Sequence, residues 1–339
     1  MKENYHNHVS DYVIPTFLWG IEPFFNDLTV RDATRGFNSR IFWGDSQQNL
    51  STGIEYGHVN ASNRDLLSSD PPFYDLSWDH WALFGNGAYT IERLTILPGI
   101  RYDHSGVSGD NTNYTLGATY KLTENTVVRA YGANGFSLTN PTIQNTPLQK
   151  ISTIQSGIET TVIPYLWLKG TYFNNYLKNS QSAGLTPVIL NQNRQGFEVE
   201  VRTTPVLNLA LTSGYTYLYA KNTDTGERLQ SNGDQAVPPH TVKLALNYDK
   251  NDLGLRGTLT GNYVWWNSPA NYPTINNPSV DSAMIWDLHL NWKINPKSEL
   301  SPELFLSGHN LFNGVQTVGG TELYTNAKRW FDGGLRVRF

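Results

Sequence analysis

The feature that most constrains this chain is a two-residue alternation of apolar and polar side chains that recurs along its length. The clearest runs are 197–202, 241–249 and 284–294. In the second run, apolar residues occupy the even positions from Val242 to Tyr248, and the residues between them include Lys243, Asn247 and Asp249. Successive side chains of a β-strand point to opposite faces, so the pattern predicts strands with one apolar and one polar face.

Further segments follow the same rule with less contrast. They are 27–43, 48–60, 77–90, 93–104, 112–121, 125–134, 151–163, 166–179, 207–220, 253–266, 300–312 and 329–339. Together they predict about fifteen strands of roughly ten residues, and residues 1–26 are a candidate for a sixteenth. No helical period extends over a useful length, so the chain is predicted to be all-β.

The connections between these strands are of two kinds that alternate. Short turns are expected near 44–46, 123–125, 163–164, 204–205, 250–252 and 295–297. Long polar connections are expected at 61–76, 104–111, 135–150, 180–190, 221–236, 267–281 and 313–328. Outer-membrane barrels alternate in this way, with short periplasmic turns and long extracellular loops. The pattern predicts an antiparallel up-and-down transmembrane β-barrel whose C-terminus is periplasmic.

Composition agrees with a sheet that meets lipid on one face and water on the other. Charged residues make up only 16% of the chain and aromatic residues 13%, while the mean hydropathy is −0.43. No run of 18 apolar residues predicts a membrane-spanning helix. A soluble β-sandwich is the alternative, but this number of strands exceeds its usual size, and no repeat indicates a propeller. The net charge of −4 argues against a nucleic-acid partner.

The last residues carry a two-faced strand of their own. Phe331, Leu335, Val337 and Phe339 share one face, and Arg336 and Arg338 share the other. A closing strand that ends on an aromatic residue resembles the sorting signal read by the barrel assembly machinery. We therefore expect the four apolar residues to act as an assembly signal.

Five short motifs then resemble those of TonB-dependent outer-membrane receptors, in that family's order. They are Leu97-Pro98-Gly99-Ile100-Arg101-Tyr102-Asp103, Asn134-Gly135-Phe136-Ser137-Leu138-Thr139-Asn140-Pro141, Asn193-Arg194-Gln195-Gly196-Phe197-Glu198-Val199-Glu200, Val237-Pro238-Pro239-His240-Thr241 and Gly308-His309-Asn310-Leu311-Phe312-Asn313. The last resembles the family's "NLF" box, and the one before it resembles the "VPxH" strand start. The resemblance implies the C-terminal barrel portion of such a receptor.

The family pattern also contains an N-terminal plug domain, a segment that contacts TonB, and twenty-two strands. No plug is expected in this sequence, so we predict a barrel over 27–339 preceded by a loop or partial strand in 1–26. The chain is then expected to be part of an incomplete 22-stranded barrel, one half of a split receptor, or a small complete barrel of about sixteen strands.

The sequence suggests binding residues but no reaction chemistry. Aromatic residues expected in extracellular loops are candidates for ligand binding, with girdle or loop packing as the alternative: Tyr74, Trp78, Phe136, Tyr272 and Tyr324. Charged residues expected to line the lumen are candidates for ligand contact, with a solvated wall as the alternative: Asp287, His289, Arg336 and Arg338. We expect no catalytic residues, no metal site and no cofactor.

The leading functional hypothesis is a TonB-dependent receptor and transporter in the outer membrane of a Gram-negative-type bacterium. Its ligand would be a ferric siderophore or a similarly large and scarce compound. The expected partners are outer-membrane lipid, the barrel assembly machinery, the ferric chelate and, if a plug is supplied, the TonB complex. A passive diffusion porin of about sixteen strands is the alternative, and an outer-membrane enzyme ranks last.

Overall fold

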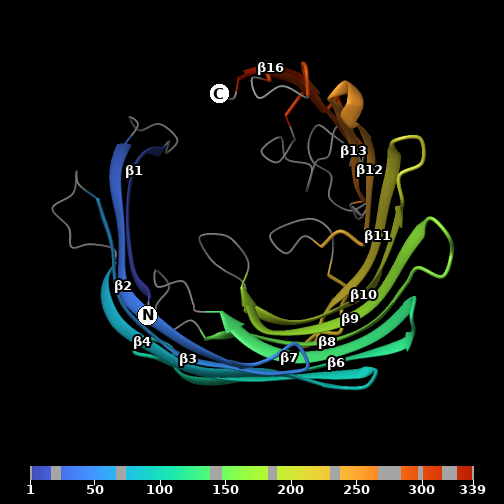
Figure 1. Ribbon diagram of the computed structural model, residues 1–339. Helices are drawn as coiled ribbons and strands as arrows, with labels where there is room; N and C mark the ends of the chain where they lie inside the picture. The colour runs from blue at the N-terminus through green and yellow to red at the C-terminus, as the bar shows by residue number, and fades with distance from the viewer. Residues whose placement is uncertain are drawn as a thin grey trace. The chain divides into compact units, whose positions relative to one another are not determined.

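The computed structural model describes residues 2–16, 24–65, 74–137, 147–181, 189–229, 237–265, 284–296, 301–314 and 327–337 (Figure 1). These residues form sixteen strands and one short 3-10 helix. The first eight strands are β1 (Lys2–Thr16), β2 (Phe24–Gly44), β3 (Gln48–Asp65), β4 (Tyr74–Ile91), β5 (Leu94–Ser105), β6 (Gly109–Thr123), β7 (Thr126–Ser137) and β8 (Gln149–Thr160). The others are β9 (Leu166–Gln181), β10 (Ile189–Thr203), β11 (Leu209–Asn222), β12 (His240–Lys250), β13 (Leu255–Trp265), β14 (Ile285–Lys293), β15 (Glu303–His309) and β16 (Trp330–Arg336), with the helix η1 at Asn251–Leu253.

The strands belong to one sheet in which their order follows the chain from β1 to β16. Neighbouring strands run antiparallel, as the registers of β1 to β5 and of β9 to β16 show. The predicted all-β, antiparallel, up-and-down architecture is confirmed. In the described part of the chain, no helix is long and apolar enough to cross a bilayer.

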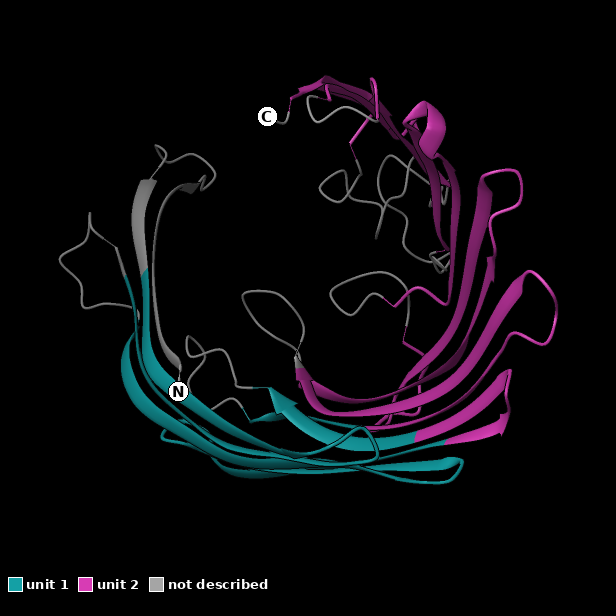
Figure 2. Cartoon of the chain, in the orientation of Figure 1, with its two compact units in different colours: residues 1–119, 131–152 teal, residues 120–130, 153–339 magenta. Residues whose placement is uncertain are grey.

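Figure 2 divides the chain into two compact units. Unit 1 comprises residues 1–119 and 131–152, and unit 2 comprises 120–130 and 153–339. In unit 1, Ile54 lies opposite Leu83 on an apolar face, and both side chains are exposed. On the other face, Arg101 Nη2 lies 2.7 Å from Glu55 Oε2, and Arg101 Nε lies 2.8 Å from Asp103 Oδ1. We call this second face the charged face of unit 1.

Unit 2 has the same two-sided construction. Cross-strand neighbours on its apolar face form the row Leu211, Leu246, Leu259 and Leu288. The next row, on its charged face, is Thr212, Ala245, Thr260 and Asp287. Leu211 and Leu246 remain 42% and 40% exposed. A continuous exposed apolar face of this kind fits contact with lipid better than contact with water.

Most connections have the predicted lengths. Short ones join β2 to β3, β4 to β5, β6 to β7 and β12 to β13, and longer ones join β3 to β4, β7 to β8 and β11 to β12. The long connection predicted at 104–111 is wrong, because β5 continues to Ser105 and β6 begins at Gly109. Its polar residues instead face each other across a tight turn, where His104 Nδ1 pairs with the Asp110 carboxylate.

A side chain closes the short connection between β2 and β3. Asp45 Oδ1 accepts hydrogen bonds from the backbone N–H groups of Gln47 and Gln48, at 2.7 and 2.9 Å. These two bonds, the one from Gln48 first, hold the pKa of the Asp45 carboxyl below its ordinary value. Asp at the first position of a tight turn commonly satisfies following backbone donors in this way.

The structure describes only part of the two segments for which the sequence made predictions at the chain ends, 1–26 and 329–339. β1 covers Lys2–Thr16 within the segment 1–26, and the division into an N-terminal segment and a barrel domain stays a prediction. In β16, Phe331 lies opposite Gly308 and Leu335 opposite Leu304, on the apolar face. Val337 follows the strand, and Arg338 and Phe339 lie outside the described residues. The role of these residues in assembly stays a prediction.

Candidate functional site

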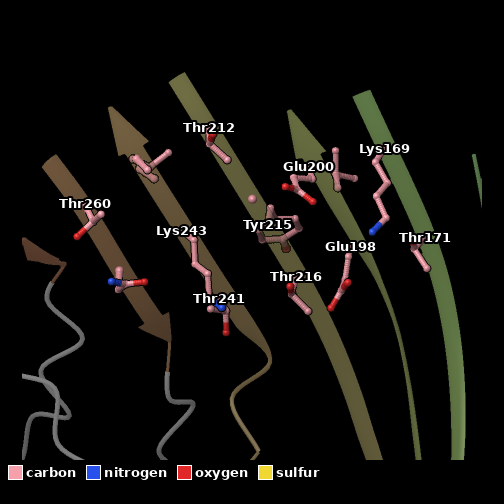
Figure 3. A pocket seen from close by; sticks show the side chains of 15 residues that line it. Lys169, Thr171, Glu198, Glu200, Thr212, Tyr215, Thr216, Thr241, Lys243 and Thr260 are labelled. Carbon is pink, nitrogen blue, oxygen red and sulfur yellow. The ribbon is translucent and has the colours of Figure 1, made fainter. Parts of the chain in front are cut away.

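The charged face of unit 2 holds a cavity of ≈ 470 Å³ over β9 to β13 (Figure 3). Strand register explains why its lining residues meet. One row across the sheet contains Lys169, Glu200, Gly214, Lys243 and Asn262. The next row contains Thr171, Glu198, Thr216 and Thr241. We call this cavity the threonine pocket.

Gly214 opens the middle of the threonine pocket. A Cβ added there would have no heavy atom within 4 Å, so there is open space above Gly214, which lies between Glu200 and Lys243 in its row. In the described part of the chain, Lys243 and Glu198 form no ion pair, whereas Glu200 pairs with Arg202 at 2.5 Å. Charges of both signs are therefore available to a bound molecule.

Threonine hydroxyl groups form a further part of the polar lining of the pocket. Thr171, Thr212, Thr216, Thr241 and Thr260 come from neighbouring strands (Figure 3). The buried Thr171 Oγ1 has no hydrogen-bond partner among the described residues. A hydroxyl both donates and accepts, so this wall suits a polar ligand or a polar protein surface.

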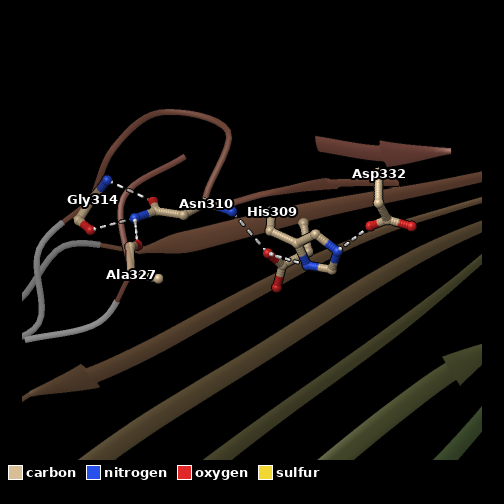
Figure 4. Close-up of polar contacts among 6 residues, drawn as sticks. His309, Asn310, Gly314, Ala327 and Asp332 are labelled. Carbon is tan, nitrogen blue, oxygen red and sulfur yellow. Dashed lines mark hydrogen bonds and ion pairs between the residues drawn. The ribbon is translucent and has the colours of Figure 1, made fainter. Parts of the chain in front are cut away.

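A second group of polar residues lies where β14, β15 and β16 meet. His309 Nε2 is 3.1 Å from Asp332 Oδ1, and His309 Nδ1 is 3.7 Å from Asp287 Oδ1 (Figure 4). The His309 ring stacks on Trp330 with a centroid distance of 3.9 Å, and its edge contacts the His289 ring at 5.3 Å. The ion-pair partner of Asp287 is thus His309, which follows from the pairing of β14 with β15.

Asn310 holds the connection that follows β15. Its Nδ2 donates to the carbonyl oxygens of Gly314 and Ala327, both at 2.9 Å, and its Oδ1 accepts from Gly314 N at 2.7 Å (Figure 4). Its own backbone N–H donates to Asp287 Oδ1 at 2.9 Å. The NLF-like motif therefore acts here as a structural clamp between β15 and β16.

Three of the predicted ligand-binding aromatics lie in strands rather than loops. Tyr74 and Trp78 belong to β4, and Phe136 belongs to β7. The prediction of loop positions was wrong because the strands extend further than their apolar pattern does. Tyr272 and Tyr324 lie outside the described residues. A role of these aromatics in ligand binding stays a prediction.

Trp78 lies on the charged face of unit 1, next to the long β3–β4 connection. Trp78 lies opposite Val59 of β3. Two positions further along β3, Ala61 lies opposite Asp32 of β2. Trp78 Nε1 and Asp32 Oδ1 are buried, and neither has a hydrogen-bond partner in the described residues. Unpaired buried polar atoms of this kind call for a bound water, ligand or partner group.

Three residues predicted to line the lumen lie on the charged face of unit 2, as their registers show: Asp287, His289 and Arg336. Lys169 and Lys243 were not predicted as site residues, although the same alternation places them on that face. No signal in the sequence indicated that Gly214 would leave a gap between them. Within the described residues, no three His, Asp or Glu side chains gather in a way that could hold a metal ion.

The family model described as "TonB dependent receptor-like, beta-barrel" matches residues 3–311. A comparison with curated proteins finds no match. Among solved structures, a mutant of the ferric enterobactin receptor PfeA of Pseudomonas aeruginosa is similar, with a TM-score of 0.75 and 17% identity over 98% of this chain and 58% of that chain.

Two further solved structures are similar to this chain to a comparable degree. The copper transporter OprC has a TM-score of 0.74 and 14% identity over 97% of this chain and 60% of that chain. The FrpB iron transporter of Neisseria meningitidis has a TM-score of 0.68 and 15% identity over 93% of this chain and 55% of that chain. At these identities the likeness shows the fold, and the present chain spans less than two thirds of each structure.

Proposed function

The chain belongs to the TonB-dependent receptor-like β-barrel family, and from this premise we propose that it forms the membrane wall of an outer-membrane receptor for a large, scarce ligand. A ferric chelate is the ligand class that we favour. The structures it resembles include a ferric enterobactin receptor and an iron transporter, and also a copper transporter. Energy for uptake is expected from the TonB complex through a plug domain.

The observation that carries this proposal is the separation of the two faces of the sheet. Exposed leucines such as Leu246 occupy one face, where lipid contact stabilises them. The other face carries the threonine pocket, where Glu198 and Lys243 have no ion-pair partner among the residues that the structure describes. A polar wall with both signs of charge suits contact with a polar ligand or a plug, which a purely structural sheet does not need.

Uptake measurements test the proposal. Cells that carry the gene, and cells from which it is deleted, are supplied with radioactive iron bound to the catecholate siderophore enterobactin under iron limitation. We expect saturable uptake that requires the gene and stops when the proton-motive force is collapsed. Uptake that continues after this collapse and depends only on solute size would instead support the passive porin and overturn the receptor proposal.

Trp78 offers a prediction for the ligand path. Trp78→Ala removes a half-buried aromatic ring, and an N–H donor with no partner among the described residues, from the charged face of unit 1, so we expect the apparent KM for ferric enterobactin uptake to rise roughly five- to tenfold. Trp43→Ala is the matched control. Trp43 is 70% exposed and lies at the end of β2, beside the short turn to β3 and away from the β3–β4 connection near Trp78. An equal change in both variants would contradict a role for Trp78 in binding.

A further inference from the structure

A second cavity, of ≈ 630 Å³, lies on the charged face of unit 2 near the β12–β13 and β14–β15 connections. Its charged lining comprises Arg256, Lys293, Glu303 and Arg336. The threonine pocket shares none of these residues. This cavity therefore has a chemistry of its own.

Strand register concentrates positive charge in this cavity. Lys293 lies directly opposite Glu303, and Glu303 lies directly opposite Arg336. Arg336 Nη1 is 3.5 Å from Glu303 Oε1, so a single carboxylate lies between two cations. Lys293 has no ion pair among the described residues. The row has an excess positive charge that a bound anion would neutralise.

Arg256 adds a third cation from β13, opposite Asn291 on β14. It shares its charge with Asp249 of the neighbouring strand, at 3.2 Å between Nε and Oδ2. Its guanidinium group has five N–H donors, and one carboxylate cannot satisfy all of them. Arg256 and Arg336 are both exposed enough for a small molecule to reach them, since their side chains are 68% and 52% accessible.

Ser301 provides an independent sign of a ligand. The residue lines the same cavity, is only 5% exposed, and its Oγ has no hydrogen-bond partner among the described residues. A buried hydroxyl without a partner destabilises the folded state unless something in the cavity bonds to it. A hydroxyl beside lysine and arginine can donate its hydrogen bond to an oxyanion that the cations hold.

We propose that this cavity is a binding site for an oxyanion, a phosphate or carboxylate group held by Lys293 and Arg336 with a hydrogen bond from Ser301. Guanidinium groups match the geometry of both oxyanions. The proposal does not depend on ferric-chelate uptake. The same chemistry has two sources, a free phosphate or an acidic side chain of a protein segment, and the experiment separates them.

Binding is measured by calorimetry on the protein extracted from outer membranes in detergent, with two probes. Inorganic phosphate represents the free anion, and N-acetyl-aspartate amide represents a protein side chain. We expect saturable binding that weakens about tenfold or more in Lys293→Gln and in Arg336→Gln, as the loss of a charged hydrogen bond implies. Lys121→Gln makes the same change of charge at an exposed position of β6 and should bind as the unaltered protein does.

Ser301→Ala separates binding from folding, because the buried Ser301 hydroxyl has no partner in the described part of the chain and its removal should leave the fold intact. We expect its affinity for the tighter probe to fall about three- to tenfold, while the thermal stability of the protein without the probe is unchanged or higher. Tighter binding of phosphate identifies a free anion, and tighter binding of the aspartate derivative identifies an acidic segment. Failure of both probes to bind, or equal binding by all four variants, overturns the proposal.

Discussion

Gly196 shows how strand pairing can require one residue type. A Cβ at this position would overlap the carbonyl oxygen of Tyr217 on β11 and would lie 2.8 Å from Cζ of Phe173 on β9. At Gly214, on the neighbouring strand β11, an added Cβ would have no heavy atom within 4 Å. The glycine of the motif around 193–200 is thus needed for close approach of strands, a role that sequence alone did not reveal.

This contrast gives a matched pair of substitutions. We expect Gly196→Ala to lower the free energy of unfolding by about 1–3 kcal/mol, because the added methyl group must displace backbone or an aromatic ring. Gly214→Ala should change it by no more than about 0.5 kcal/mol. Urea unfolding in lipid vesicles measures both. Equal losses would mean that strand propensity, rather than close approach, governs the two positions.

Asn310 carries a second prediction at this scale. Asn310→Ala removes three side-chain hydrogen bonds that join the β15 end to Gly314 and Ala327. At about 0.5–1.5 kcal/mol for each bond, the connection should lose roughly 2–3 kcal/mol of local stability. Limited proteolysis should then cleave it faster than in the unaltered protein. Asn125→Ala, in an exposed turn, should leave the cleavage rate unchanged; equal rates in both variants would show that the clamp does not matter.

At the scale of the strand, the sequence predicted the strands and their two faces, but it did not predict contacts between strands, which depend on their register. Alternation such as that of 241–249 follows from the strand period itself, so β12, β14 and their two faces were predictable. The contact between Asp287 and His309 was not, because it depends on how β14 and β15 are offset by their connection. The threonine pocket was missed for the same reason: its rows cross five strands.

The two faces of β12 can be tested with one pair of substitutions. Leu246→Arg places a charge on the apolar face, between Leu211 and Leu259, and should destabilise the protein in a bilayer by about 2–4 kcal/mol. Ala245→Arg places the same charge beside the threonine pocket, where water and Glu200 are available, and should be far milder. Unfolding in lipid vesicles provides the measurement. Similar losses in the two variants would contradict the assignment of the lipid face.

At the scale of the whole molecule, most connections that follow even-numbered strands are short and most that follow odd-numbered strands are long, with β5–β6 and β14–β15 as the exceptions. In unit 1 the turns that follow β2 and β4 lie at the end opposite the connection that follows β3, and in unit 2 the turn that follows β12 lies at the end opposite the connection that follows β11. In outer-membrane barrels the long connections face outward and the short turns face the periplasm. The orientation of this chain is therefore a proposal that a single labelling experiment can decide.

The chain has no cysteine, so any thiol introduced into it reports on one position only. Thr225→Cys lies in the exposed turn that follows β11, and Asp252→Cys lies in η1, the short connection that follows β12. Intact cells treated with a membrane-impermeant maleimide should label the first and leave the second unlabelled until the outer membrane is disrupted. Both residues belong to unit 2 and are exposed, so accessibility to the reagent differs only by membrane side. Labelling of Asp252→Cys alone would reverse the orientation, whereas labelling of both in intact cells would contradict a membrane-embedded wall.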